Sequence, residues 1–316
     1  MVENPEPGTN LVEGSSASRL CQAPVGLNHV FCHVDSTTYA AVARSNFVRE
    51  AFAVVEERTT RTAAADNWHG FYLYGESTYV ELLQSAEGTG AQVANAGIAY
   101  GFERPGQGVE LADLLSRELG RPATLKRVDR MLGCEAVPWF QMAWVNRDAS
   151  SSVCSFGMEY APEFIARWHG ERPPHVKSFE QALQRHVVIE RYAAVLGAHG
   201  EERLMKDVQV VRLALDDAAA VDLQRELEVM GFRRHDDGPE GIVYLSGDLR
   251  IEIRRTLPHR AGGIVGLGLS LRRAVPVPQR IDLGSSQLML VGDRAWWTFK
   301  ASLDGIEESS QEAWLR

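Results

Sequence analysis

Alternating apolar and polar positions predict the same supersecondary unit twice in the first half of the chain. The first unit has a strand at 27–35, a helix at 36–52, and strands at 54–62, 69–75 and 78–85. The second has a strand at 95–103, a helix at 109–120 closed by Gly120, and strands at 123–130, 137–145 and 153–161. Both therefore have the order βαβββ.

The order returns after a separate amphipathic helix. Residues 178–197 carry a capping box from Ser178 to Gln181 and end at Gly197, and we interpret them as a connector between domains. A third unit follows, with a strand at 207–216, a helix at 217–231 and strands that end with 249–256. A fourth copy is partial, because 262–273 and 285–299 resemble strands and no helix fits between them.

This repetition predicts an α+β fold of tandem βαβββ units that form two cupped sheets, the C-terminal one degenerate. The length of 316 residues suits two domains with their own cores. We predict a disordered tail at 1–25, an N-terminal domain of two units at 26–170, a connector helix at 171–200 and a degenerate C-terminal domain at 201–316. The tail is predicted because it is acidic and rich in Pro, Gly and Ser.

Charge and composition limit the classes of molecule that the protein is expected to bind. The net charge of −9 argues against a general affinity for nucleic acid or an anionic membrane, since both require a basic surface. No segment approaches the ~20 apolar residues of a membrane helix, and the N-terminus has no apolar targeting core. The four cysteines show no metal-binding spacing. We therefore expect a cytoplasmic protein that binds a small molecule.

A glutamate recurs in the middle of an apolar strand in three of the units. Alignment of the last strands places Glu81 opposite Glu159 and Glu252, and alignment of the first strands places His29 opposite Gly97. A carboxylate in such a strand costs several kcal/mol to desolvate unless a cation, a metal or water compensates. Strand alternation directs His29 and Glu81 into the concave side of the sheet. Imidazole and carboxylate together suit Zn²⁺, Fe²⁺, Mn²⁺, Co²⁺ or Ni²⁺.

Paired units that open with "LNHV" and close with "YVELL" resemble the vicinal oxygen chelate superfamily, which includes glyoxalase I, extradiol dioxygenases and bleomycin resistance proteins. Within it, the chain is most similar to an uncharacterised bacterial glyoxalase-like group. The resemblance implies a divalent metal (Fe, Zn, Mn, Ni or Co) held by His29, Glu81 and Glu159. The fourth position falls on Gly97, which cannot ligate, so water or substrate would complete the shell.

The resemblance also implies the chemistry. The metal would chelate adjacent substrate oxygens and stabilise an oxyanion during isomerase, epimerase, lyase or dioxygenase reactions. A second hypothesis is a non-catalytic protein that sequesters an aromatic or antibiotic-like ligand, which Gly97 and the many aromatic residues favour.

Further polar residues are candidates for acid–base roles. His33 shares a face with His29 but lies about 13 Å along the strand, which suits a general base or a substrate contact better than a shared metal. On the third strand, either His69 or the tyrosines Tyr72 and Tyr74 line the cup, and we take His33, His69 and Tyr72 as catalytic candidates.

In the C-terminal half, the notable polar residues are clustered arginines and a glutamate, and we identify no catalytic candidate there. Glu252 lies between Arg250 and Arg254 on one strand face, which predicts either an ion-pair network or an anion-binding cup. Trp296 and Trp297 near the C-terminus suggest an interdomain contact or the interface of a homodimer.

Overall fold

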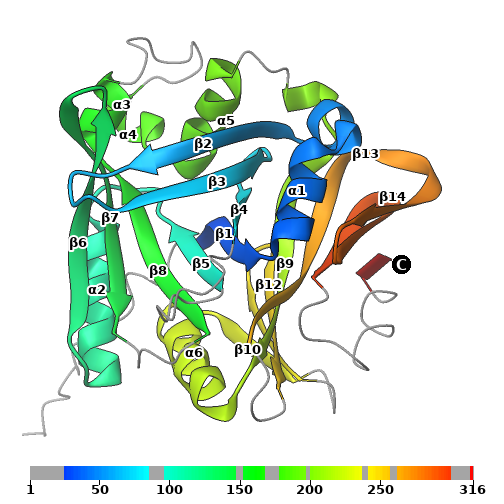
Figure 1. Cartoon of the computed structure of the whole chain (residues 1–316). Helices are drawn as coiled ribbons and strands as arrows, with labels where there is room; N and C mark the ends of the chain where they lie inside the picture. Colours follow the sequence, from blue (N-terminus) through cyan, green and yellow to red (C-terminus); the bar gives the residue numbers. More distant parts are fainter. Residues whose placement is uncertain are drawn as a thin grey trace, which may run out of the picture.

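Two curled β-sheets, one of eight strands and one of six, form the frame of the protein and confirm the predicted α+β fold (Figure 1). The computed structural model describes residues 25–84, 96–146, 152–167, 178–196, 200–236, 241–256, 262–299 and 314–315. The predicted tail, apart from Val25, and the boundary predicted at residue 170 lie outside these residues.

The eight-stranded sheet contains the first two predicted units. The first unit consists of β1 (Gly26–Val34), α1 (Ser36–Arg44), the π-helical turn η3 (Phe47–Phe52), β2 (Val54–Arg61), β3 (Asn67–Tyr74) and β4 (Tyr79–Gln84). The second consists of β5 (Ala96–Gly101), α2 (Gln107–Leu119), β6 (Ala123–Leu132), β7 (Glu135–Val145) and β8 (Val153–Tyr160). The strand order is β2-β3-β4-β1-β5-β8-β7-β6, so the units meet where β1 pairs antiparallel with β5.

The six-stranded sheet contains the third unit and the partial fourth. The third unit is β9 (Met205–Leu215), α6 (Asp217–Val229), β10 (Arg233–Asp236), β11 (Ile242–Ser246) and β12 (Leu249–Arg255). The fourth is a long hairpin of β13 (Gly263–Leu283) and β14 (Ser286–Phe299) with no helix between the strands, as predicted. Because β9 pairs antiparallel with β13, this sheet repeats the central contact of the first.

A large apolar core joins the two sheets. It combines side chains from the first sheet, such as Val30 and Val80, with Val211, Leu267 and Trp297 from the second, all fully buried. The two halves therefore bury one shared apolar surface. Trp296 and Trp297 are 2% and 0% exposed, so they lie inside the molecule and not on a dimer surface.

A second core fills one end of the concave face of the first sheet, which we call the cup. Three short helices contribute to it: α3 (Pro162–Arg167), α4 (Phe179–Ala182) and α5 (Arg185–Val195). The predicted connector helix is thus two helices, because Gln184 adopts an extended backbone that separates them. Buried apolar residues of α5 pack into the cup beside β3, and the α3–α5 region lies along one edge of the molecule (Figure 1).

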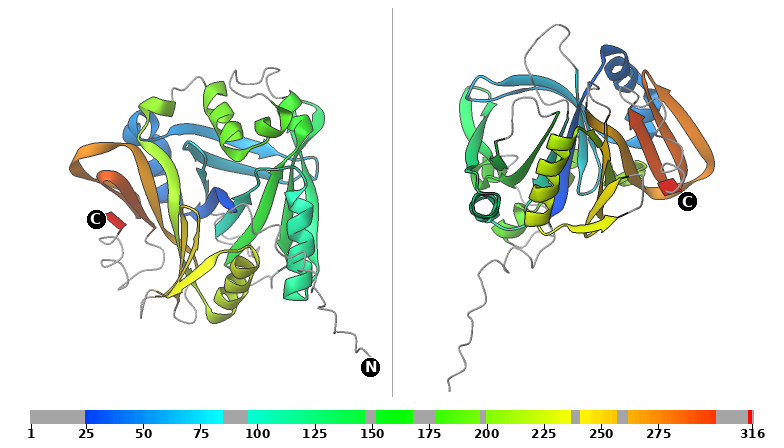
Figure 2. Two further views of the ribbon diagram at one scale, coloured as in Figure 1. Left: turned by 180° about the vertical axis from the view of Figure 1, so that it is seen from behind. Right: turned by 90° about the horizontal axis from the view of Figure 1, so that it is seen from below.

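Polar contacts fasten the sheets at the start of β4. Asp207 accepts hydrogen bonds through Oδ1 from the amides of Ser77 and Thr78, both at 2.8 Å, and from the Thr78 hydroxyl at 3.0 Å. The Val208 amide in turn donates to that hydroxyl at 2.8 Å. The two views in Figure 2 show the second sheet beside the first along this junction. No helix among the described residues is long and apolar enough to cross a membrane.

Candidate functional site

His29 lies in the cup, as predicted, where its ring packs on aromatic neighbours and one ring nitrogen is hydrogen-bonded. It is 5% exposed, its ring stacks on Tyr79 at 4.4 Å, and its Nδ1 lies 2.8 Å from the Asn28 amide oxygen. A β-bulge between Leu27 and His29 turns Asn28 inward, where it also donates to the Tyr160 hydroxyl. Burial, and then the nearby Arg58 charge, lower the pKa of His29 to about 3. The imidazole is therefore neutral at physiological pH.

Glu81 lies on the same face, two register positions along from His29, because His29 pairs with Tyr79 and Phe31 pairs with Glu81. It is 7% exposed, and the Trp68 indole donates a 2.8 Å hydrogen bond to its Oε1. The Trp68 indole also reaches the Tyr72 hydroxyl at 3.0 Å. Burial raises the pKa of Glu81, although hydrogen bonds from Tyr72 and Trp68 and the charge of Arg58 oppose the shift. Glu81 is thus a buried carboxyl group held by two donors.

Arg58 on β2 is the charged residue of the cup that sequence analysis missed. Its guanidinium donates to Glu56 and, at 2.8 Å, to the Tyr74 hydroxyl, and its Cζ lies 3.9 Å from the centre of the Tyr72 ring. Burial alone would lower the pKa of Arg58. The larger combined effect comes from its neighbours Tyr74, Tyr192, Tyr72 and Glu56, which raise the pKa well above its ordinary value, so the guanidinium stays charged.

Glu159 lies on the other face of the sheet. Its carboxylate accepts the amides of Gly106 and Gly108, both at 2.8 Å, where α2 begins. A carboxylate there satisfies free amides and complements the helix dipole.

The strand register explains this displacement. His29 pairs with Ala99 and Phe31 with Gly97, so the pseudo-two-fold axis between β1 and β5 relates His29 to Gly97 and Phe31 to Ala99. Because Phe31 pairs with Glu81 and Ala99 with Phe156, the counterpart of Glu81 in the second unit is Phe156. The alignment of Glu81 with Glu159 is therefore displaced by three residues, and an odd displacement reverses the face of a strand.

The implied divalent metal does not fit this arrangement. Among the described residues, no group of three His, Cys, Asp or Glu side chains is placed to hold a metal ion. His29 and Glu81 lie in the cup, but Glu159, the third predicted ligand, lies on the other face of the sheet, where it binds the start of α2. The fourth position, Gly97, is covered by the Phe31 ring, which a Cβ atom at Gly97 would overlap.

The three predicted catalytic residues lie in different places. Tyr72 lines the cup with Tyr74, so the tyrosines and not His69 occupy the concave face. His69 lies on the opposite face, exposed to solvent, with its ring nitrogens 3.0 Å from the Thr59 hydroxyl and 3.4 Å from Glu57. His33 is half-buried on the cup face, edge-on to Phe31 at 6.1 Å, and burial lowers its pKa.

The cup has a filled end and a more open end. Tyr192 of α5 stacks on Tyr74 at 5.4 Å and accepts a hydrogen bond from the Trp139 indole at 3.2 Å, which fills the end next to His29. Half-buried side chains occupy the other end of the same face: Phe31, His33, Leu83, Met142, Trp144 and Cys154. Glu81 lies between the two ends.

In the second sheet, Glu252 takes the place of Glu81. It pairs with Arg212 on β9, as Glu81 pairs with Phe31 on β1. Arg212 and Arg250 each donate from Nε to one oxygen of Glu252 at 2.7 Å, which confirms the predicted ion-pair network and adds Arg212 to it. The C-terminal sheet thus places arginine where the cup has an aromatic ring.

The strand order and the cup define a protein of tandem βαβββ units with a polar cluster buried in the first sheet. The chain belongs to a family of unknown function (DUF5829), whose model matches residues 27–299. None of the curated proteins compared with the chain matches it significantly.

The solved structures matched to the chain share little sequence with it. A hypothetical protein from Staphylococcus aureus is 9% identical, with a TM-score of 0.48, and the match covers 82% of this chain and 96% of that one. A xylose isomerase-like TIM barrel/4-hydroxyphenylpyruvate dioxygenase fusion protein is 10% identical, with a TM-score of 0.40, over 77% of this chain and 35% of that one. A protein from Bacillus subtilis that is named for dioxygenase activity is 9% identical, with a TM-score of 0.17, and the match covers 74% of this chain and 86% of that one.

The position of Glu159 leads to a stability prediction. We expect Glu159→Gln to lower the free energy of unfolding by about 1 kcal/mol, because the start of α2 loses a charged acceptor. Urea denaturation measures the change, and Asp113→Asn, an exposed acid beyond the first turn of α2, is the control. Unchanged stability together with loss of ligand binding in the cup would contradict the structural role and restore Glu159 to the site.

Proposed function

We propose that the chain is a vicinal oxygen chelate-type protein whose first cup binds a small organic molecule and transfers a proton through Glu81, without the metal set His29, Glu81 and Glu159. The observation that carries the proposal is the buried Glu81 carboxyl group, held by Trp68 and Tyr72 at the border of the open end of the cup. Its position suits a group that meets a ligand in that end.

The energetic cost of the cluster supports a functional role. Glu81, His29 and Arg58 are all buried on a face that apolar residues could fill with a gain in stability. Ionisable groups placed in this way, with shifted pKa values, concentrate at functional sites. The aromatic surroundings, with Tyr72, Tyr74 and Trp68, suit a ligand that is itself flat or apolar.

The arrangement suits isomerisation or epimerisation among the reactions that the resemblance implies. Both need a group that removes a proton from one position and returns it at the same or an adjacent one, and a carboxyl group with a raised pKa can do this near neutral pH. The Trp68 indole and the Tyr72 hydroxyl are hydrogen-bond donors beside it. Arg58 is paired with Glu56 on the same face, so this ion pair adds little net positive charge beside Glu81.

Replacing Glu81 by glutamine tests the proposal through stability. Because burial raises the pKa of Glu81 above its ordinary value of 4.5, the folded state binds this proton more tightly than the unfolded chain does. Its contribution to stability therefore falls as pH rises from the unfolded pKa through the folded one, and stays lower above it. We expect Glu81→Gln to remove this fall and to raise the free energy of unfolding at pH 7 by on the order of 1 kcal/mol.

Urea denaturation between pH 4 and pH 8 measures the effect of Glu81→Gln. The control is Asp293→Asn, since Asp293 is exposed on β14 and has no hydrogen bond or ion pair to another described residue. A Glu81→Gln protein less stable than the wild type at pH 7 would make Glu81 a structural acceptor and contradict the proposal.

Metal analysis tests the second part of the proposal, that the cup acts without a bound divalent metal. We expect purified protein to hold no stoichiometric divalent metal, and EDTA to leave its melting temperature unchanged. Stoichiometric metal that is lost in both His29→Ala and Glu81→Ala would contradict a metal-free cup.

A non-catalytic binding protein is the second candidate. The packing of α5 favours it, because Tyr192 and the aromatic residues around it line the cup with apolar surface that suits tight binding of an apolar ligand. Molecules that co-purify with the protein, identified by mass spectrometry and incubated in D₂O, distinguish the two. Deuterium uptake with the wild type and not with Glu81→Gln supports proton transfer, whereas binding without exchange supports sequestration.

A further inference from the structure

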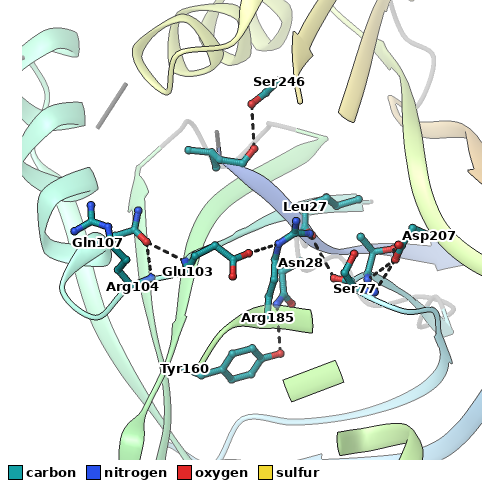
Figure 3. A network of polar contacts seen from close by, with 12 residues as sticks. Leu27, Asn28, Ser77, Glu103, Arg104, Gln107, Tyr160, Arg185, Asp207 and Ser246 are labelled. Atoms are coloured by element: carbon teal, nitrogen blue, oxygen red, sulfur yellow. Dashed lines mark hydrogen bonds and ion pairs between the residues drawn. The ribbon is translucent and has the colours of Figure 1, made fainter. Parts of the chain in front are cut away.

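A cavity of about 240 Å³ lies away from His29 and Glu81, where the two sheets meet the start of α5. Residues of β1, the turn before β4, β9 and the β11–β12 turn line it together with Arg185. Figure 3 draws some of these residues around Arg185. Drug-sized ligands occupy pockets of about 300–1,000 Å³, so this cavity suits a smaller molecule.

Arg185, the first residue of α5, reaches into this junction. Its Nε donates to Glu103 at 2.6 Å, and its Nη1 donates to the carbonyl oxygen of Leu27 (Figure 3). The Gln107 side chain fixes Glu103 in turn, by accepting its backbone amide at 2.9 Å. Among the described residues, Arg185 Nη2 donates no hydrogen bond, which leaves this end of the guanidinium available to a ligand.

Two paired glycines make room for this guanidinium. Gly26 and Gly101 face each other across β1 and β5. A Cβ atom at Gly26 would lie 2.5 Å from Arg185 Cζ, and one at Gly101 would lie 2.8 Å from Arg185 Cδ. Any larger residue at either position would displace the side chain, so the backbone of the first sheet is shaped around Arg185.

Two carboxylates line the same cavity. Asp207 uses Oδ1 for its three bonds to Ser77 and Thr78, and its other oxygen accepts none within the part of the chain that is described. Asp248 is exposed in the β11–β12 turn, and its carboxylate likewise has no hydrogen bond to a described residue. The cavity thus offers one guanidinium edge and two anionic groups.

We propose that this cavity binds a small zwitterion of amino-acid size, with its carboxylate on Arg185 and its ammonium group between Asp207 and Asp248. Glu103 balances the charge of Arg185, so the site as a whole is acidic and a simple anion would be repelled. A ligand that carries both charges meets both features, and charge-assisted hydrogen bonds at each end give it affinity.

Titration calorimetry and thermal shift with L-alanine, L-serine and L-glutamine test the proposal, with acetate and methylammonium as single-charge probes. We expect saturable binding of at least one amino acid, and weaker binding of both single-charge probes. Asp248→Asn should weaken that binding by about tenfold or more, because one charge-assisted bond is lost. Asp113→Asn, the same change on exposed α2, should leave it unchanged.

Arg185→Gln provides a second variant, and we expect it to abolish selectivity for the carboxylate. If Arg185→Gln unfolds, Asp248→Asn in its exposed turn decides the outcome alone. Absence of binding by all three amino acids up to about 10 mM would overturn the proposal. So would an affinity unchanged in Asp248→Asn, or methylammonium that binds as tightly as the amino acids.

Discussion

Replacement of Glu252 by alanine is expected to lower the free energy of unfolding by about 3–5 kcal/mol. Glu252 is 8% exposed and Arg212 is 3% exposed, and each oxygen of the carboxylate accepts one arginine Nε at 2.7 Å. Removal of the carboxylate leaves the Arg212 guanidinium buried without its counter-ion. Arg212 Nη2 already has no hydrogen-bond partner among the described residues, and its guanidinium lies 4.3 Å from the Trp296 ring.

Urea denaturation of three variants measures this effect. Glu118→Ala is the control, because it breaks an exposed ion pair with Arg117 and should cost less than about 1 kcal/mol. The double variant Arg212→Met/Glu252→Leu removes both buried charges, and we expect it to recover most of the loss. A cost below about 1 kcal/mol for Glu252→Ala would show that water or other groups compensate Arg212.

A fragment of residues 25–200 is expected not to fold as a soluble monomer. Its apolar face would lose the part of the shared core that the second sheet supplies, which includes the fully buried Val211, Leu267 and Trp297. Exposure of a contiguous apolar face of this kind leads to aggregation. The fragment also lacks Asp207, whose carboxylate accepts hydrogen bonds from the amides of Ser77 and Thr78 and so links the two sheets.

Size-exclusion chromatography and thermal denaturation followed by circular dichroism measure the outcome. Residues 25–316 are the matched control, since they lack the predicted tail but keep both sheets. A monomeric fragment that unfolds cooperatively near the melting temperature of this control would show that the first sheet is an independent domain.

Alternation of apolar residues predicted most of the strands because one face of each is buried. The same signal failed for Arg58, since β2 carries polar residues on both faces and nothing distinguished Arg58 from Glu57. It failed for Glu159 for a geometric reason: the sequence around it resembles that of Glu81, but three residues of displacement place it on the opposite face.

The role of α5 was also beyond the sequence. Amphipathic spacing predicts that one side of a helix is buried, but it does not say against what. The connector helix therefore looked like a bridge between domains, whereas Tyr192 fills one end of the cup and Arg185 borders the junction cavity.

The tip of the β13–β14 hairpin touches the first helix of the chain. The Ser285 amide donates to the Thr38 hydroxyl at 3.0 Å across 247 residues, and a Cβ atom at Gly284 (φ +67°) would lie 2.6 Å from Thr38 Cα. During synthesis, α1 therefore leaves the ribosome long before its cover exists. Contacts of such long sequence separation form late and slow folding, so this docking is one of the last steps of folding.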